Sequence, residues 1–220
     1  VTRSGCLMQE FTAPQVTGMI TLGGGLIRTS RSRAQGNQAA IQQLFSAGFR
    51  FMIHGEIFDQ SASPTNYPST PAEILSTVKT IGVDRFVSVS GPNEPNAPAK
   101  IVDPVTFWQY LRDYQRDLYN TFKADPATRD TVLVLSPGWR FDKDEMVASI
   151  GDIDQWIDGH EVHTYPTANQ HPERTQAYDI VTAAFGVGNP TKPGLIGEFG
   201  YHTASGPWGA DDAVAAKDRL

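Results

Sequence analysis

Residues 86–96 have the sequence Phe-Val-Ser-Val-Ser-Gly-Pro-Asn-Glu-Pro-Asn, and this stretch is the best guide to the fold. Its first five residues combine aromatic, β-branched and small side chains, which is typical of a β-strand. The glycine and the two prolines that follow end the strand and stiffen a loop that presents Asn93 and Glu94. The sequence therefore predicts a strand whose carboxyl end carries an amide and a carboxylate.

The rest of the chain repeats this arrangement, because short apolar runs alternate with longer helical patterns. The predicted strands are Leu26–Thr29, Phe49–His54, Phe86–Ser90, Val132–Ser136, His160–His163 and Leu195–Glu198. Helices are predicted at Gln15–Leu22 and Gln35–Ala47, after Thr70, after Asp103 and from Pro172. Strands that are separated by helices form βα units with parallel strands, so the chain is expected to be an α/β protein.

Two α/β architectures fit this rhythm, a doubly wound sheet and a (β/α)8 TIM barrel. A nucleotide-binding doubly wound sheet carries a glycine-rich fingerprint after an early strand, whereas Gly23-Gly24-Gly25 precedes a strand and lacks the required spacing. The barrel is favoured because strand after strand ends in a chemically capable side chain, and barrel active sites are built from strand ends. These residues are Arg28, His54, Asn93, Glu94, Trp139, His163, Tyr165 and Glu198.

The two ends of the chain do not show a complete barrel pattern. Residues 1–24 contain the first predicted helix and a weak apolar run at Cys6-Leu7-Met8, so a first strand is not evident. The residues after Glu198 can supply a loop and the start of a helix from Asp211, but no eighth strand is evident. We therefore expect residues 1–220 to form a single barrel domain that is a fragment of a longer chain.

The composition excludes several classes of function. The 220 residues carry a formal net charge of −6 without a compensating basic run, which argues against a nucleic-acid partner. The longest wholly apolar runs are far shorter than the ~18 residues that a membrane span needs. The single cysteine excludes an internal disulfide framework. No signal-peptide pattern is present, and we expect a mature protein that is secreted or extracellular, with the cytoplasm as the alternative location.

A metal site is not expected. His160 and His163 belong to the stretch Gly-His-Glu-Val-His, which differs from the H-E-x-x-H zinc motif by one residue in spacing. The stretch is a predicted strand, so these two histidines should point to opposite faces. We expect a reaction that needs neither a metal nor an organic cofactor.

The two strand-end carboxylates indicate a reaction class. Glu94 follows one predicted strand, and Glu198 ends another and is flanked by Gly197 and by Phe199-Gly200. Glycosidic cleavage requires two carboxylates, one to protonate the leaving oxygen and one to attack the anomeric carbon or to activate water. The sequence therefore predicts a glycosidase site at the mouth of the barrel.

Three motifs resemble the retaining glycoside hydrolases of clan A, the (β/α)8 group that includes cellulase-, mannanase-, xylosidase- and iduronidase-like enzymes. They are Asn93-Glu94-Pro95 after a fourth strand, His163-Thr164-Tyr165-Pro166 after a sixth and Gly197-Glu198-Phe199-Gly200 after a seventh. Each motif is weak alone, whereas their joint order and spacing make the resemblance specific. It covers residues 28 to 201 of the chain.

The resemblance implies a role for each matching residue. Glu94 would be the general acid/base, and Asn93 would hold the 2-hydroxyl group of the sugar. Glu198 would be the nucleophile, which His163 and Tyr165 would orient.

Two further residues match positions that the clan often uses. Arg28 would be the arginine on the second strand near the nucleophile, and His54 would be the histidine that closes the third strand. On its own sequence context, His54 could equally be a buried, hydrogen-bonded core histidine, and the two interpretations are equally weighted.

The four tryptophans divide into two groups. Trp139 ends a predicted strand and Trp208 lies in a loop after Glu198, so both are candidates to stack on sugar rings. Trp108 and Trp156 lie in helical stretches and are expected to pack in the core.

The leading hypothesis is a retaining O-glycoside hydrolase that acts on an oligo- or polysaccharide. A non-catalytic carbohydrate-binding barrel is the alternative from another functional class, although both carboxylates and their auxiliary residues are present. An inverting hydrolase on the same fold is a second alternative. The separation of the two carboxyl groups distinguishes the mechanisms, at about 5 Å for retention and roughly 6.5–9.5 Å for inversion.

Overall fold

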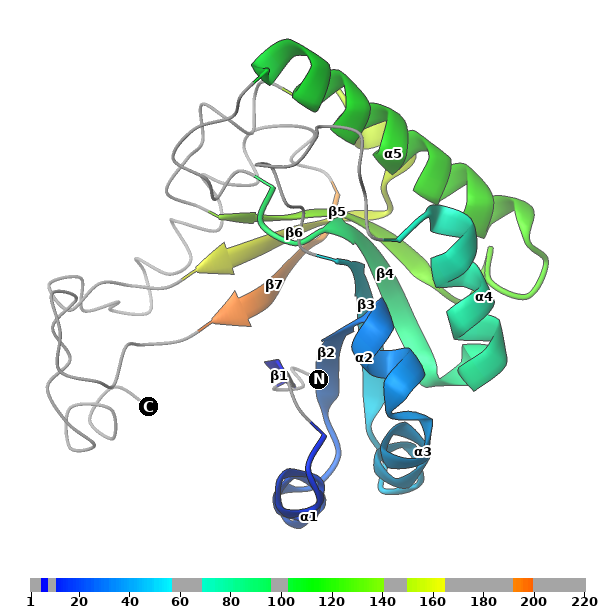
Figure 1. Ribbon diagram of the computed structural model, residues 1–220, viewed down its shortest axis with the longest axis vertical. Helices are drawn as coiled ribbons and strands as arrows, with labels where there is room; N and C mark the ends of the chain where they lie inside the picture. Colours follow the sequence, from blue (N-terminus) through cyan, green and yellow to red (C-terminus); the bar gives the residue numbers. More distant parts are fainter. Residues whose placement is uncertain are drawn as a thin grey trace, which may run out of the picture.

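The computed structural model describes residues 5–7, 11–56, 69–95, 103–140, 150–164 and 192–199. Within these residues, seven parallel strands form one sheet in the order of the sequence, and the sheet curls as in Figure 1. The strands are β1 (Gly5–Leu7), β2 (Leu26–Ser30), β3 (Arg50–Gly55), β4 (Phe86–Pro92), β5 (Leu133–Arg140), β6 (Gly159–Thr164) and β7 (Gly194–Phe199). A curled parallel sheet with sequential strand order is the architecture of a (β/α)8 barrel, so the predicted fold class is confirmed.

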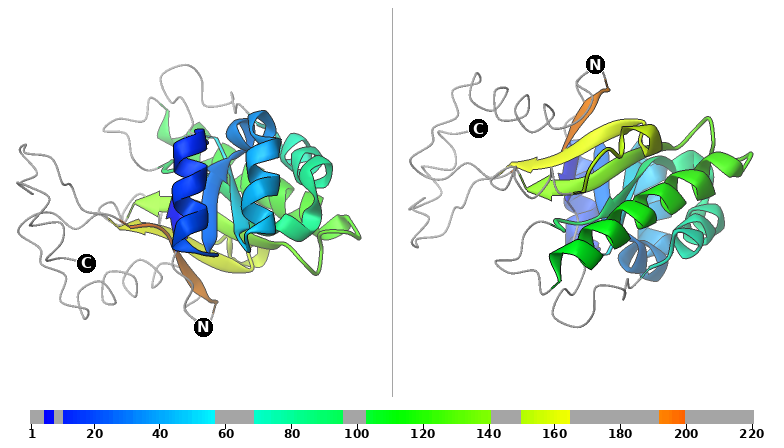
Figure 2. Two further views of the ribbon diagram at one scale, coloured as in Figure 1. Left: turned by 90° about the horizontal axis from the view of Figure 1, so that it is seen from below. Right: turned by 90° about the horizontal axis from the view of Figure 1, so that it is seen from above.

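The helices lie along the outer side of this sheet, as Figure 1 and both views of Figure 2 show. The helices are α1 (Ala13–Leu22), α2 (Arg31–Gly36), α3 (Gln38–Ser46), α4 (Pro71–Ile81) and α5 (Pro104–Ala124), with the short 3-10 helices η1 (Val83–Arg85) and η3 (Asp154–Trp156). The helices do not cover the inner side of the curl, where Arg28, Glu161 and His163 contact one another.

Helices α4 and α5 begin where the sequence predicts. The hydroxyl of Thr70 accepts a hydrogen bond from the backbone N–H of Glu73, whose carboxylate in turn accepts from the backbone N–H of Thr70. Asp103 accepts from the backbone N–H of Thr106 in the same way. Pro follows each capping residue, where its missing N–H has no helical partner to lose.

The predicted helix Gln35–Ala47 is two helices in the structure. Helix α2 begins at Arg31 and ends at Gly36, and α3 begins at Gln38. Asn37 separates them with a φ of −128°, outside the helical range. Gly36 and Asn37 are weak helix formers, which is the physical reason for the break.

The first strand, which was not evident in the sequence, is present in the structure. Gly5–Leu7 pairs in parallel with β2, with Cys6 opposite Ile27. A strand of three residues has no periodicity to recognise, and pairing to β2 is what makes it a strand. An eighth strand would fall outside the described residues.

The hydrophobic core lies between the sheet and the helices. One cluster joins Ile27, Ile53 and Val89 of the sheet to Ile74 and Leu118 of α4 and α5. A second cluster lies between the N-terminal half of α5, the end of β5 and the segment around η3. Because side chains alternate along a strand, the neighbours of the core residues face the inside of the curl.

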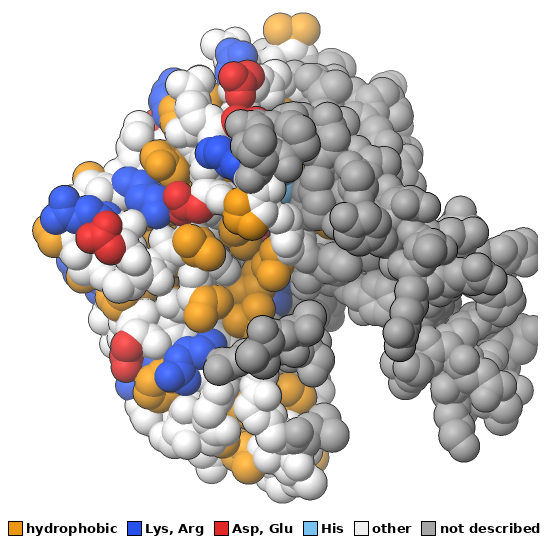
Figure 3. Space-filling model, turned by 180° about the vertical axis from the view of Figure 1, so that it is seen from behind, with side chains coloured by type: hydrophobic (Ala, Val, Ile, Leu, Met, Phe, Trp, Pro, Cys, Tyr) orange, Lys and Arg blue, Asp and Glu red, His pale blue; other side chains and the backbone are white. Residues whose placement is uncertain are grey.

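None of the described helices is both long and apolar enough to cross a bilayer. On the face shown in Figure 3, the described Lys and Arg side chains are interspersed with Asp and Glu rather than gathered into one basic patch.

Candidate active site

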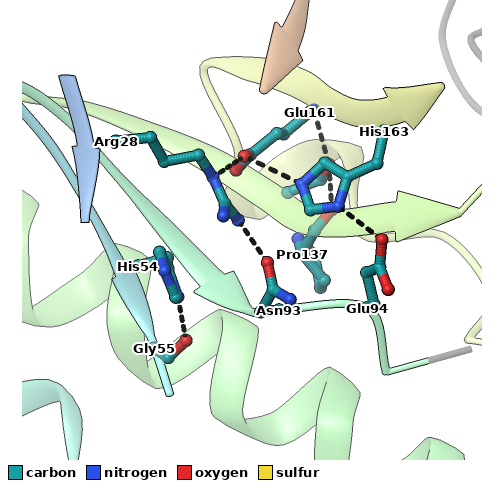
Figure 4. A network of polar contacts seen from close by, with 9 residues as sticks. Arg28, His54, Gly55, Asn93, Glu94, Pro137, Glu161 and His163 are labelled. Carbon is teal, nitrogen blue, oxygen red and sulfur yellow. Dashed lines mark hydrogen bonds and ion pairs between the residues drawn. The ribbon is translucent and has the colours of Figure 1, made fainter. Parts of the chain in front are cut away.

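The inner side of the sheet brings together residues from four strands (Figure 4). Arg28 comes from β2, His54 from β3, Asn93 and Glu94 from the segment just after β4, and His163 from β6. Because all the strands are parallel, their carboxyl ends meet at one end of the sheet. These five residues, which the sequence singled out, therefore share one region of the molecule.

Glu94 is held in an unusual backbone conformation. Its φ is +43°, in the left-handed region that non-glycine residues rarely adopt. The backbone N–H of Glu94 donates to the carbonyl oxygen of Gly138 in β5 at 2.8 Å, and this bond fixes the conformation. Strained residues of this kind gather at functional sites. The Glu94 side chain is 22% exposed, whereas its partner His163 is completely buried.

Arg28 links Asn93 to the interior of the sheet. Its side chain is 2% exposed, and its Nη2 donates to Asn93 Oδ1 at 2.7 Å. Its Nε donates to Glu161 Oε1 at 2.5 Å. The bond to Oδ1 fixes the orientation of the Asn93 amide. Its Nδ2 group, which can donate hydrogen bonds, therefore points away from Arg28.

Glu161 of β6 belongs to the same polar network, although the sequence analysis did not single it out as a site residue. Its side chain is completely buried and forms an ion pair with Arg28. Burial acts to raise the pKa of Glu161, but Arg28 and a hydrogen bond with His163 outweigh it and hold that pKa well below its usual value. The available signal was its spacing, since Glu161 precedes His163 by two residues and must share its face of the strand.

His163 joins Glu161 to Glu94. Its Nδ1 lies 3.0 Å from Glu94 Oε1, and its Nε2 lies 3.3 Å from Glu161 Oε1. Burial acts to lower the pKa of His163, but the hydrogen bonds with Glu161 and then Glu94 reverse the effect, so the pKa is raised. His160, on the opposite face, lies instead 3.6 Å from Asp154 Oδ1, as the alternation of a strand predicts.

His54 is a buried neutral side chain. Desolvation and then the charge of Arg28 hold the pKa of His54 well below its usual value. Its Nδ1 lies 2.6 Å from the carbonyl oxygen of Gly55, which can only accept a hydrogen bond. His54 therefore carries its hydrogen on Nδ1 and offers Nε2 as an acceptor.

The backbone of Glu198 lies beside His163. In β7, Ile196 pairs with Val162 and Glu198 pairs with His163, so Gly197 is an extra residue that forms a β-bulge. The structure describes the backbone of Glu198 but not its side chain. Tyr165 and Trp208, the other predicted site residues, lie outside the described residues.

Trp139 requires a correction. The sequence assigned it to sugar stacking, but its ring is 5% exposed and packs with Phe107, Leu111 and Ile153 in the second core cluster. The preceding Gly138 faces Arg28 and His163 on the inside of the sheet, so Trp139 must face outward. Trp108 and Trp156 belong to or pack against the same cluster, as predicted.

Trp139→Ala is therefore expected to destabilise the fold rather than to weaken saccharide binding. Removing a buried indole leaves a cavity between β5 and α5 and costs about 3–5 kcal/mol. Urea denaturation would measure this loss, and saccharide affinity below the unfolding transition should remain that of the unchanged protein. A selective loss of saccharide affinity without a loss of stability would contradict the packing role.

Among the described residues, no group of three or more His, Cys, Asp and Glu side chains is arranged to hold a metal ion. Several polar side chains on the inner side of the sheet pair with one another, among them Arg28, Glu161 and His163. The hydrogen-bonded pair of Glu94 and His163 can take part in proton transfer.

The sequence matches no protein-family model and no curated protein. Solved structures do share its fold, and two of them are glycoside hydrolases. A subgroup I endo-β-1,3-glucanase of glycoside hydrolase family 128 from Amycolatopsis mediterranei, in complex with laminaritriose, has a TM-score of 0.57 at 16% identity. A family 5 glycoside hydrolase from Prevotella bryantii has a TM-score of 0.56 at 13% identity.

These two alignments cover 97% and 94% of this chain and 77% and 73% of the two enzymes. Saccharomyces cerevisiae Gas2p, in complex with laminaritetraose and laminaripentaose, has a TM-score of 0.56 at 12% identity. That alignment covers 93% of this chain, which spans 50% of the length of Gas2p. At these identities the similarity establishes a shared fold, the barrel of glycoside hydrolases.

Proposed function

We propose that this protein is a retaining O-glycoside hydrolase in which Glu94 is the general acid/base and Glu198 is the nucleophile. One observation carries the proposal: the ring of His163 is hydrogen-bonded to Glu94, and His163 is the register partner of Glu198 in the sheet. One carboxylate residue bonded to this histidine and a second in register with it would provide the pair that glycosidic cleavage needs.

The proposed reaction proceeds in two displacements. In the first, a carboxylate oxygen of Glu198 attacks the anomeric carbon while Glu94 gives its proton to the leaving glycosidic oxygen, and the glycosidic bond breaks. In the second, Glu94 removes a proton from water, which attacks the anomeric carbon and releases Glu198 as a carboxylate. The two inversions of configuration give a product with net retention.

The neighbouring polar side chains support this chemistry. Arg28 holds Asn93 by its Oδ1 atom, which leaves the Nδ2 group to donate to a sugar hydroxyl. His54 offers Nε2 as an acceptor for a second hydroxyl. Hydrogen bonds to the sugar that strengthen as the charge develops lower the barrier.

The proposed substrate is an oligo- or polysaccharide. The family 128 enzyme and Gas2p, which share this fold, hold laminari-oligosaccharides in their structures. The sequence has 18 basic and 24 acidic residues, a net charge of −6. This negative net charge fits a neutral saccharide better than a polyanionic one.

The test is a screen of aryl glycosides with the configuration of the first-formed product followed by NMR. Hydrolysis with retention is expected. Hydrolysis with inversion would replace the proposal by the inverting mechanism, for which the two carboxyl groups should stand roughly 6.5–9.5 Å apart instead of about 5 Å. Saccharide binding without any hydrolysis would favour the non-catalytic carbohydrate-binding barrel.

A further inference from the structure

We propose that Glu161 is a positioning residue that, through Oε1, holds Arg28 against Asn93 and His163 against Glu94. The inference rests on the proposed function, because it assigns Glu161 to the acid/base Glu94. The contacts form one continuous chain from Asn93 to Glu94, which are neighbours in the sequence (Figure 4). Glu161 is the central member of that chain.

The hydrogen-bond geometry fixes what each atom of His163 does. Oε1 of an ionised Glu161 can only accept, so His163 Nε2 carries a hydrogen and donates it. Nδ1 then faces Glu94 Oε1, also a carboxyl oxygen, and one hydrogen lies between these two atoms. Glu161 thereby reserves the Nδ1 side of the ring for Glu94.

The surrounding backbone is shaped to fit the Glu161 side chain. A Cβ atom at Gly197 in β7 would overlap Glu161 Oε1. A Cβ atom at Gly138 in β5 would lie 2.6 Å from His163 Nε2 and 3.0 Å from Arg28 Nη2. The distance to His163 is shorter than Cβ atoms adopt in proteins, and the distance to Arg28 is tighter than most Cβ contacts. Glycine at positions 138 and 197 therefore leaves room for the network on either side of β6.

The charges of the network explain why a carboxylate is needed at this position. The positive charge of Arg28 in β2 lowers the pKa of His163, and the negative charge of Glu161 raises that pKa. Among the residues that the structure describes, the other titratable groups on this side of the sheet include the neutral His54 from β3 and Glu94 after β4, and the backbone of Glu198 in β7 is in register with His163. With Glu161 ionised, the Arg28–Glu161 pair is neutral, and His163 can carry hydrogens on both nitrogens.

This arrangement assists Glu94 when it has given up its proton. The Nδ1–H group of His163 then donates to the Glu94 carboxylate, and Glu161 keeps the ring in place through Nε2. A charge-assisted hydrogen bond of this kind is about twice as strong as a neutral one. Glu161 touches neither substrate nor reacting atoms and acts through His163 and Arg28.

The test compares Glu161→Gln, Glu161→Asp and the control Asp154→Asn in the full-length protein. Asp154 is the matched carboxylate, because it faces His160 on the other side of the same strand. The ring nitrogens of His163 are titrated by NMR, with their signals assigned by loss in His163→Gln. The pH profile of kcat/KM is measured on the aryl glycoside that the unchanged protein hydrolyses best.

In Glu161→Gln the pKa of His163 should fall, and the loss of activity with rising pH should begin at lower pH. The value of kcat/KM should drop by about 10- to 100-fold, the equivalent of one charge-assisted hydrogen bond. Glu161→Asp should restore the raised pKa of His163 because it restores the charge. Asp154→Asn should change neither the titration of His163 nor the pH profile.

The inference and the proposed function can fail separately. If the unchanged protein hydrolyses no glycoside, the proposed function fails, whereas the His163 titration still tests the role of Glu161. If the His163 titration is the same in Glu161→Gln, or if its pKa in the unchanged protein is not raised, the inference is overturned whatever the activity. Should Glu161→Gln fail to fold, the titrations of the unchanged protein and Glu161→Asp decide the matter.

Discussion

Glu198→Ala is expected to reduce kcat on aryl glycosides by on the order of 10⁴- to 10⁶-fold, as the loss of a catalytic nucleophile does in other enzymes. Without the carboxylate of Glu198 no glycosyl-enzyme can form, because the protein then supplies no nucleophile to the anomeric carbon. The methyl group of alanine also leaves space at the position opposite His163 in the sheet. A small external nucleophile can use that space.

Azide should therefore restore part of the turnover of Glu198→Ala, and the glycosyl azide should have the inverted configuration because only one displacement occurs. Circular dichroism would establish that the variant is folded. Asp130→Ala serves as the control, since Asp130 lies on the surface with its side chain 84% exposed. Normal turnover in Glu198→Ala, or a glycosyl azide of retained configuration, would remove Glu198 from the role of nucleophile.

Glu94→Ala is expected to produce a loss that depends on the leaving group. An alkyl glycoside needs a proton on its leaving oxygen, so its hydrolysis should fall by about 10²- to 10⁴-fold. A dinitrophenyl glycoside needs no such proton, so its first step should stay near the normal rate and the glycosyl-enzyme should accumulate. A pre-steady-state burst of dinitrophenolate would measure this step directly.

The configuration of the glycosyl azide distinguishes the roles of the two carboxylates. In Glu94→Ala azide replaces water in the second displacement, so the glycosyl azide should have the retained configuration. Glu94→Gln, which keeps the shape of the side chain beside His163, should show the same dependence on the leaving group. An equal loss for the alkyl and the dinitrophenyl substrate in the first step would show that Glu94 is not the acid.

The sequence alone predicted much of the architecture. The capping residues Thr70 and Asp103 placed the starts of α4 and α5, because a helix start is decided by local hydrogen bonds to its first free N–H groups. Apolar runs placed strands β2 to β7 to within a few residues in most cases, because burial of one strand face leaves a local pattern. β5 was the exception, since it continues to Arg140 through Pro137 and Gly138.

The direction of Trp139 shows why a local pattern was insufficient for part of the site. Val134 faces the helices, and strict alternation from there would turn Trp139 to the inside of the sheet. The register of β5 against β6 shifts between Leu135 and Gly138, and this irregularity reverses the alternation. The shift is set by pairing with another strand, so residues 133–140 by themselves do not contain it.

The sequence by itself determined which carboxylate and amide stand at the strand ends, because parallel strands bring those ends together whatever lies between them. Only the tertiary structure decided that Glu161 is buried against Arg28 and bonded to His163. A buried carboxylate is stable only beside a positive charge, and that charge comes from a strand 133 residues earlier in the chain. The left-handed turn at Glu94 and the bulge at Gly197 depend in the same way on bonds to neighbouring strands, which form only when the sheet is assembled.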